Sequence, residues 1–172
     1  MEFGYFRQLA RYNRWANRRL YDACGALPES EYMRPRESFF GSIHATLNHI
    51  LVGDRLWLGR FTGHPASGIH ALDQILYGEF LGLRIAREAE DAQIVNFVDG
   101  LDLPTLNSTL RYETMSAPRR MTATPMRITL GHFFNHQAHH HGQVHVLVSQ
   151  TAVAPPSLDL IQFAREEVPA SG

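Results

Sequence analysis

The sequence predicts an all-α protein: a four-helix bundle with a long crossover, a short β-hairpin before the fourth helix and a short C-terminal helix. Apolar residues recur every three or four positions in four long segments, as in helices with one buried face. Clusters of glycine and proline separate these segments. The chain has 172 residues, 44% of them hydrophobic, which is enough for one core. We therefore expect a single domain over residues 1–172.

The first two helices are expected at residues 2–26 and 42–61. In the first, aromatic and aliphatic side chains recur near the helical period and arginines occupy the intervening positions. Glycine and two prolines in residues 25–38 predict that a loop follows it. The second helix begins after Ser42, a good N-cap residue. Its side chains are apolar around most of the helix, which predicts a central position in the bundle.

The helical period returns in residues 72–101, where Gly78 and Gly82 weaken the first half of the pattern. The period then changes to alternation. Residues 108–114 and 119–124 alternate and are rich in threonine, which predicts a short β-hairpin. We expect the long crossover of the bundle to lie between its second and fourth helices.

The fourth helix is expected to begin at Thr124 and Pro125, with the hydroxyl as cap and the proline in the first turn. It runs to about residue 150, because two prolines at 155–156 forbid its continuation. Residues 159–167 then form the short terminal helix.

Charge and cysteine content limit the classes of function. Sixteen Lys and Arg against seventeen Asp and Glu give a net charge of −1, which argues against a nucleic-acid partner. Cys24 is the only cysteine, so no intramolecular disulfide can form and a reducing cytoplasm fits best. The sequence contains neither an export signal nor an apolar stretch of membrane-spanning length. We expect a soluble cytoplasmic protein without a membrane partner.

Histidine is the compositional feature that points to chemistry. Six of the ten histidines lie between residues 132 and 145. Residues four apart lie one turn above each other on a helix, so two imidazoles at that spacing can bind one metal ion. Spacing alone does not choose among the three pairs: His132 with His136, His136 with His140, and His141 with His145.

The helical wheel favours one pair. With His136 at zero and 100° per residue, His140 falls near 40°, inside the apolar arc of about 20–80°, whereas His145 falls at 180°, toward solvent or a partner chain. A lone histidine on an apolar face is usually a hydrogen-bonded core residue, but an inward pair in a bundle favours a metal site. The third ligand must come from another helix. His44 and His49 are the candidates, and periodicity does not decide between them.

Three ordered motifs extend this interpretation: Tyr12-Asn13-Arg14-Trp15-Ala16-Asn17; Asn48-His49-Ile50-Leu51 followed by Asp54-Arg55-Leu56-Trp57-Leu58; and Asn135-His136-Gln137-Ala138-His139-His140-His141-Gly142-Gln143. Together they resemble the DinB family of bacterial metal-binding four-helix bundles, which are related to YfiT-like proteins. The resemblance covers nearly the whole chain, including Asp-Leu-Ile near the C-terminus.

The resemblance implies a divalent metal ion, most often nickel or zinc, held by His49, His136 and His140 in a homodimer. The position of His141 is often arginine in the family, which makes His141 an alternative ligand here. Asp54 and Gln143 are candidates for orienting the ligand imidazoles from behind. Asp54 could instead pair with a buried arginine, and Gln143 could be a surface residue.

Three neutral imidazoles leave at least one coordination position open, as in catalytic sites. A metal ion there would lower the pKa of bound water or activate a thiolate. Imidazole ligands do not identify the metal, and the absence of a carboxylate counts against an iron oxygenase.

Two functions remain open at this point. One is a metal-dependent enzyme; the resemblance implies a thiol-dependent S-transferase or a hydrolase acting on an unidentified small molecule. The alternative is a non-catalytic, stress-associated, metal-binding dimeric bundle. An accessible pocket at the metal favours the enzyme, and a site closed by a fourth ligand such as His141 favours the alternative.

Overall fold

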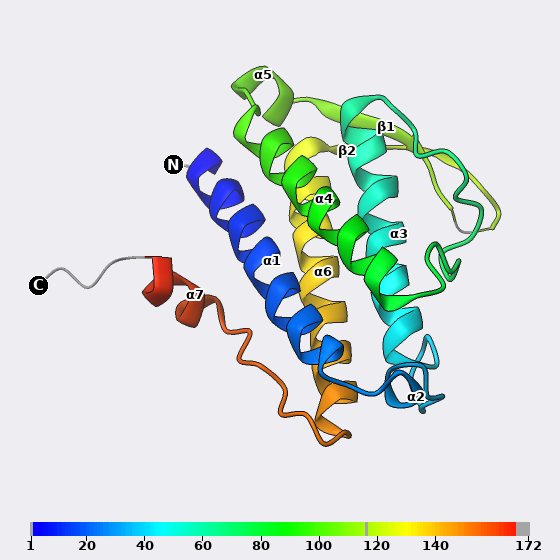
Figure 1. The fold of residues 1–172 in the computed structure, drawn as a ribbon. Coiled ribbons are helices and arrows are strands. Elements are labelled where there is room, and N and C mark those ends of the chain that lie inside the picture. Colours follow the sequence, from blue (N-terminus) through cyan, green and yellow to red (C-terminus); the bar gives the residue numbers. More distant parts are fainter. Residues whose placement is uncertain (1, 116, 168–172) are drawn as a thin grey trace, which may run out of the picture.

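Four long helices form a bundle in the computed structural model, which describes residues 2–115 and 117–167 (Figure 1). They are α1 (Glu2–Gly25), α3 (Ile43–Thr62), α4 (Phe80–Asp99) and α6 (Met126–Ser149). Helix α1 packs against α4 and α6, and α3 packs against the same two helices. Helices α1 and α6 run one way and α3 and α4 the other (Figure 1). The predicted bundle is confirmed, but the long connection that its parallel pair requires joins the second and third helices, α3 and α4, and not the second and fourth as expected.

Short elements close the ends of the bundle. The predicted hairpin is formed by antiparallel strands β1 (Thr109–Glu113) and β2 (Met121–Pro125). The terminal helix α7 (Leu160–Glu167) packs on the outer side of α1 (Figure 1). Two one-turn helices fall in segments that were expected to be irregular, α2 (Glu29–Tyr32) and α5 (Leu103–Leu106).

The start of α3 follows the predicted capping chemistry, whereas the start of α6 does not. Ser42 Oγ accepts a hydrogen bond from the Ala45 backbone N–H at 3.0 Å, which satisfies one of the unpaired donors of the first turn. The prediction that Thr124 caps α6 is wrong, because Thr124 pairs with Leu110 in the hairpin. The residue before α6 is Pro125, which makes no side-chain cap.

The prediction of a helix from residue 72 is also wrong, because α4 begins only at Phe80. Asn48 of α3 binds the preceding segment through its side chain. Its Oδ1 accepts from the backbone N–H groups of Leu76 and Tyr77 at 2.9 and 3.0 Å, and its Nδ2 donates to the Tyr77 carbonyl at 3.2 Å. The backbone groups that a helix would use are therefore bound to α3, and this tertiary contact overrides the local helical pattern.

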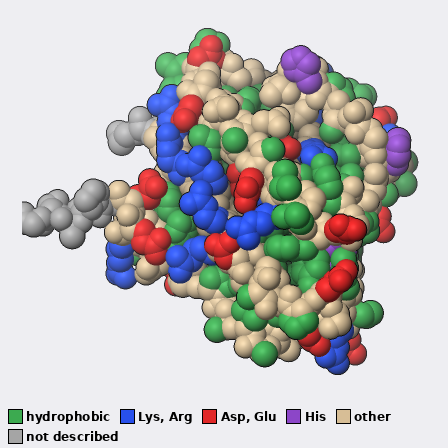
Figure 2. Space-filling view, viewed as in Figure 1, with side chains coloured by type: hydrophobic (Ala, Val, Ile, Leu, Met, Phe, Trp, Pro, Cys, Tyr) green, Lys and Arg blue, Asp and Glu red, His purple; other side chains and the backbone are tan. Residues whose placement is uncertain are grey.

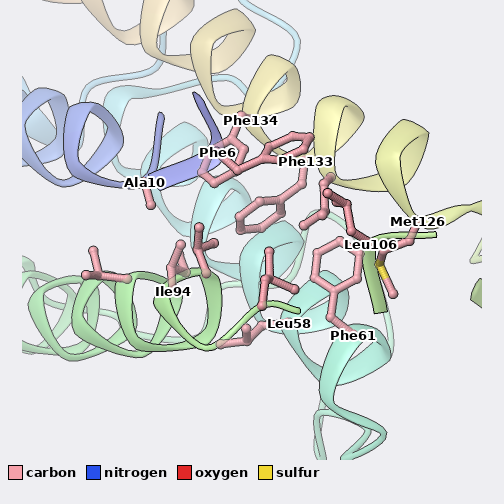
Figure 3. Close-up of a cluster of buried hydrophobic side chains, with 13 residues drawn as sticks. Phe6, Ala10, Leu58, Phe61, Ile94, Leu106, Met126, Phe133 and Phe134 are labelled. Atoms are coloured by element: carbon pink, nitrogen blue, oxygen red, sulfur yellow. The ribbon is translucent and has the colours of Figure 1, made fainter. Parts of the chain in front are cut away.

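The core consists of two apolar clusters separated by a polar layer. One cluster gathers aromatic and aliphatic side chains at the α5 end of the bundle (Figure 3). The other lies at the opposite end, toward α2, and contains the buried free thiol of Cys24. Between them each long helix contributes buried polar side chains: Asn13, Asn17, Asp54, Arg87, Asp91, Gln137 and His141.

The surface carries both signs of charge. On the face formed by α1 and α4, basic and acidic side chains are interspersed (Figure 2). Arg11 pairs with Asp99 and Arg84 with Asp22 across these two helices. No helix among the described residues is both long and apolar enough to cross a membrane.

Candidate metal centre

The structure brings three histidines together between α3 and α6. His49 comes from α3, and His136 and His140 come from successive turns of α6. Their Nε2 atoms form a triangle: 3.3 Å from His49 to His136, 3.1 Å from His49 to His140, and 3.1 Å from His136 to His140. His49 and His140 are buried, and His136 is half-buried.

The hydrogen bonds behind two of these rings set their orientation. The Nδ1–H of His49 donates to the backbone carbonyl of Leu72 at 2.7 Å, because a carbonyl can only accept. Neutral His49 therefore presents an Nε2 lone pair to the cluster. His140 Nδ1 lies 2.8 Å from Gln143 Oε1, which fixes the same tautomer when that oxygen faces the ring. Two acceptor nitrogens then face each other at 3.1 Å with no proton between them.

A divalent metal ion resolves this repulsion and fits the spacing. Two nitrogens each about 2.0–2.1 Å from one ion lie roughly 2.9–3.4 Å apart at ordinary coordination angles. All three observed separations fall in that range. The donor set, imidazole without carboxylate or thiolate, suits zinc, nickel or copper.

The site favours neutral imidazole, the form that binds metal. Burial, together with the neighbouring His140 and His49, lowers the pKa of His136 to about 3. Burial also lowers the pKa of His140, to about 4, although its hydrogen bond with Gln143 opposes this shift. The pKa of His49 is lowered by burial as well. The three groups remain deprotonated at pH values where an exposed histidine is charged.

Packing around the triangle holds the rings in place. The ring of Phe40 stacks on His49, with centroids 3.9 Å apart and planes 21° from parallel, and its edge approaches His140. On the other side Gly53 leaves room for His136, since a Cβ on Gly53 would lie 2.9 Å from His136 Cε1. The glycine one turn after His49 therefore leaves the space that the His136 ring occupies.

We predict that Gly53→Ala weakens metal binding while leaving the fold stable. The new methyl group displaces the His136 ring, and a misplaced ligand should cost roughly tenfold or more in affinity. Alanine itself favours a helix by up to about 1 kcal/mol over glycine. Competition with a chromophoric chelator measures the affinity, and thermal unfolding measures the stability.

Gly131→Ala is the matched control. Gly131 lies on the same helix as His136, and a Cβ at this position would have no neighbouring atom within 4 Å. It should leave affinity unchanged. Equal affinities for Gly53→Ala and the wild type would show that the ring position is not critical.

Two cavities meet at the cluster. One, of about 290 Å³, contains His49 and His136 together with Trp57, Arg60 and Tyr112 in its lining. The other, of about 510 Å³, contains His49 and His140 with the phenylalanines Phe39 and Phe40. Leu72 lines both. The cluster is therefore accessible from two sides.

The other candidate residues lie elsewhere. His44 is buried against the hydroxyl of Tyr32, 3.0 Å away, so of the two α3 candidates only His49 reaches the cluster. His141, the alternative ligand, faces the polar layer: its Nε2 lies 2.8 Å from Asn17 Oδ1. The structure does not bring it to the other three histidines.

The two candidates for orienting ligands separate as well. Asp54 lies in the polar layer, fully buried and bound to Arg87, and within the described part of the chain no hydrogen bond joins it to the histidine triangle. Gln143 does contact His140, and its Nε2 lies 3.2 Å from His139.

Some groups at the site were not anticipated from the sequence. The Leu72 carbonyl and Phe40 belong to connecting segments, and neither has a motif that marks it. Asn48 was noted only as part of a motif, although it anchors the segment from which the Leu72 carbonyl is presented. A polar residue on the apolar face of a helix is the pattern that could have indicated such a role.

Comparisons with known proteins agree with this architecture. The sequence matches the DinB family over residues 1–170, which includes all three histidines of the triangle. It is also 27% identical to Protein DinB of Bacillus subtilis (strain 168) over 158 residues, covering 88% of this chain and 89% of that relative. The similarity therefore extends over the whole bundle and not over one motif.

Proposed function

This chain belongs to the DinB family, and from that premise and the histidine triangle we propose that it is a metal-dependent enzyme, an S-transferase that uses a thiol or a hydrolase. His49, His136 and His140 would hold the ion, with zinc or nickel suggested by the family resemblance and compatible with the imidazole donors. When bound, the ion would supply a Lewis acid that lowers the pKa of a coordinated water or thiol.

The observation that carries this proposal is the access to the triangle from two cavities. A structural metal site is closed by four protein ligands, whereas a catalytic site keeps an open position. Among the described residues, the group that could hold an ion comprises three histidines and no fourth ligand. His141 was the candidate fourth ligand that would have favoured the non-catalytic alternative. Its side chain contacts Asn17 instead, which supports the enzymatic proposal.

The chain's own residues have distinct tasks in this scheme. The Leu72 carbonyl and Gln143 orient two imidazoles. Phe40 stacks on the His49 ring and holds its orientation. Two cavities that share His49 suit two reactants, which favours a transferase over a hydrolase. We also propose a cytoplasmic homodimer, as the resemblance and the buried free Cys24 suggest.

The test compares the metal-loaded wild type with His140→Ala. Zinc- and nickel-loaded protein is assayed with cysteine and 1-chloro-2,4-dinitrobenzene, where an S–C bond forms and chloride and a proton are released, and with p-nitrophenyl acetate for hydrolysis. We expect turnover that depends on metal and is lost in His140→Ala. Equal rates with and without metal across both assays would contradict an enzymatic role for the triangle.

A further inference from the structure

Arg60, in the last turn of α3, carries a charge that the protein does not neutralise. Its Nη2 donates to the backbone carbonyl of Glu113 at 3.0 Å. Its guanidinium lies over two aromatic rings, 4.6 Å from the centroid of Trp57 and 4.8 Å from that of Tyr112. Within residues 2–115 and 117–167, no carboxylate lies at ion-pair distance from it.

Arg60 combines the lack of an ion pair with partial burial, whereas other arginines without one among the described residues, such as Arg14 and Arg18, are exposed. Many other arginines lie within 4.0 Å of an acidic side chain: Arg7, Arg11, Arg19, Arg34, Arg36, Arg55, Arg84, Arg87 and Arg119. Arg60 is also half-buried, and burial lowers its pKa. A partly desolvated charge without a counter-charge is costly, so its retention calls for a ligand that supplies one.

The guanidinium lines the same cavity as two histidines of the triangle. This cavity, of about 290 Å³, contains no acidic side chain in its lining. The rest of its wall is formed by uncharged groups: Gly53, Leu56, Trp57, Leu72, Tyr112, Thr114 and Met115, with His132 and the ligands His49 and His136.

The second cavity has a different character. Its lining contains Asp73 and the apolar rings of Phe39 and Phe40, and no arginine. The two sides of the triangle therefore select different chemistry, with the anion-attracting side at Arg60.

We propose that the cavity lined by Arg60, Trp57 and Tyr112 binds the carboxylate of a small organic acid, whose remaining atoms extend toward His136. The two rings and the Glu113 carbonyl hold the guanidinium plane, which leaves N–H groups free to form the paired hydrogen bonds that arginine makes with carboxylates. The apolar wall at Leu56 and Met115 suits a hydrocarbon body.

A carboxylate fits better than a phosphate group. Arg60 supplies one positive charge, and one of its donors is already used by Glu113. A phosphate monoester carries nearly two negative charges and would need a second cation. The substrate identity rests on the proposed function, because it assumes that this cavity leads to the reactive centre. The carboxylate site itself does not depend on bound metal.

The test measures binding of three matched probes by titration calorimetry: phenylacetate, its neutral isostere phenylacetamide, and phenyl phosphate. Each is titrated into metal-free and zinc-loaded wild type. We expect phenylacetate to bind at least tenfold more tightly than phenylacetamide in both forms, and more tightly than phenyl phosphate. No preference of the wild type for the acid over the amide would overturn the proposal, and tighter binding of phenyl phosphate would overturn its assignment to a carboxylate.

Variants then locate the site. Arg60→Met should lose at least tenfold in phenylacetate affinity, and Arg60→Lys, which keeps the charge but not the paired geometry, should fall between Arg60→Met and the wild type. Arg111→Met is the control. Arg111 lies in β1 next to Tyr112, but its side chain is exposed and does not line the cavity. Unchanged affinity in Arg60→Met with a normal unfolding temperature would place the probe elsewhere and reject the assignment.

The failure of this inference and of the proposed function can be told apart. Zinc content is measured on every variant. Normal zinc content with no preference for the acid rejects only the carboxylate site. Arg60-dependent binding of phenylacetate to a chain that retains no zinc rejects only the metal-dependent function.

Discussion

Replacing His136 by alanine is expected to abolish tight metal binding while leaving the fold intact. His136 Nε2 lies 3.3 and 3.1 Å from the other two nitrogens of the triangle, and its loss leaves two ligands. Removal of a group that merely orients a ligand costs about 10- to 100-fold in affinity, so removal of a ligand should cost more. Alanine is a strong helix former, so α6 should persist. Chelator competition measures the affinity, and circular dichroism measures the helix content.

His145→Ala is the matched control. His145 lies on the same helix, outside the triangle, so its replacement should leave the affinity within a few-fold of the wild type. Retention of wild-type affinity in His136→Ala would show that metal, if bound, is bound elsewhere on the chain.

Replacing Arg87 by methionine should produce the largest loss of stability, about 3–5 kcal/mol, because it leaves buried carboxylates without a counter-charge. Arg87 Nη1 donates to Asp54, and its Nη2 lies 3.0 Å from Asp91. All three side chains are nearly inaccessible to solvent. Asp91 also accepts a hydrogen bond from Asn17 at 2.9 Å, but within the described part of the chain Asp54 Oδ1 has no partner even in the wild type. Urea unfolding measures the loss.

The loss should shrink at lower pH. Burial raises the pKa of Asp54 to about 7, although Arg87 opposes the shift, and burial raises the pKa of Asp91 as well. A carboxyl group with a raised folded-state pKa stabilises the fold below its unfolded value and loses that contribution as pH rises through the folded value. Without Arg87 both pKa values rise further. The deficit of Arg87→Met should therefore be smaller at pH 5 than at pH 8.

Arg84→Met provides the control for this comparison. Arg84 lies one turn earlier on α4 and pairs with the exposed side chains of Asp22 and Glu88. Exposed ion pairs contribute about 0–1 kcal/mol, so this variant should lose no more than that. Equal losses for the two variants would show that Arg87 does not balance the buried carboxylates.

The hydrophobic period was sufficient to locate the four helices, because each buries an apolar stripe against two neighbours. It failed where a distant side chain decides the backbone conformation. The segment before α4 has the helical pattern, yet the Asn48 side chain accepts hydrogen bonds from the backbone N–H groups of Leu76 and Tyr77 and holds the segment in a non-helical conformation. No local pattern carries that information. The prediction that Thr124 caps α6 was wrong because threonine is common both at helix N-caps and in strands, so the local sequence does not distinguish the two.

The site was predictable to different degrees for its three histidines. The spacing of His136 and His140 on one helix face follows from helix geometry alone. The third histidine could not be chosen that way, because α3 is apolar on most sides and both His44 and His49 are buried in it. Only the family resemblance selected His49. The structure explains the difference, because His44 lies against the hydroxyl of Tyr32, whereas the backbone carbonyl of Leu72 orients His49. The unpaired charge of Arg60 becomes visible only in the folded chain, since charge counts cannot show which arginines are both partly buried and without an ion pair.

X-ray absorption spectroscopy on the zinc-loaded wild type tests the central claim most directly, because it counts the ligands of the ion and identifies their type. The account predicts one zinc per chain, three imidazole nitrogens at about 2.0–2.1 Å and at least one oxygen from solvent. Four protein ligands, a sulfur ligand, or no zinc retained by the folded chain would contradict an open three-histidine centre.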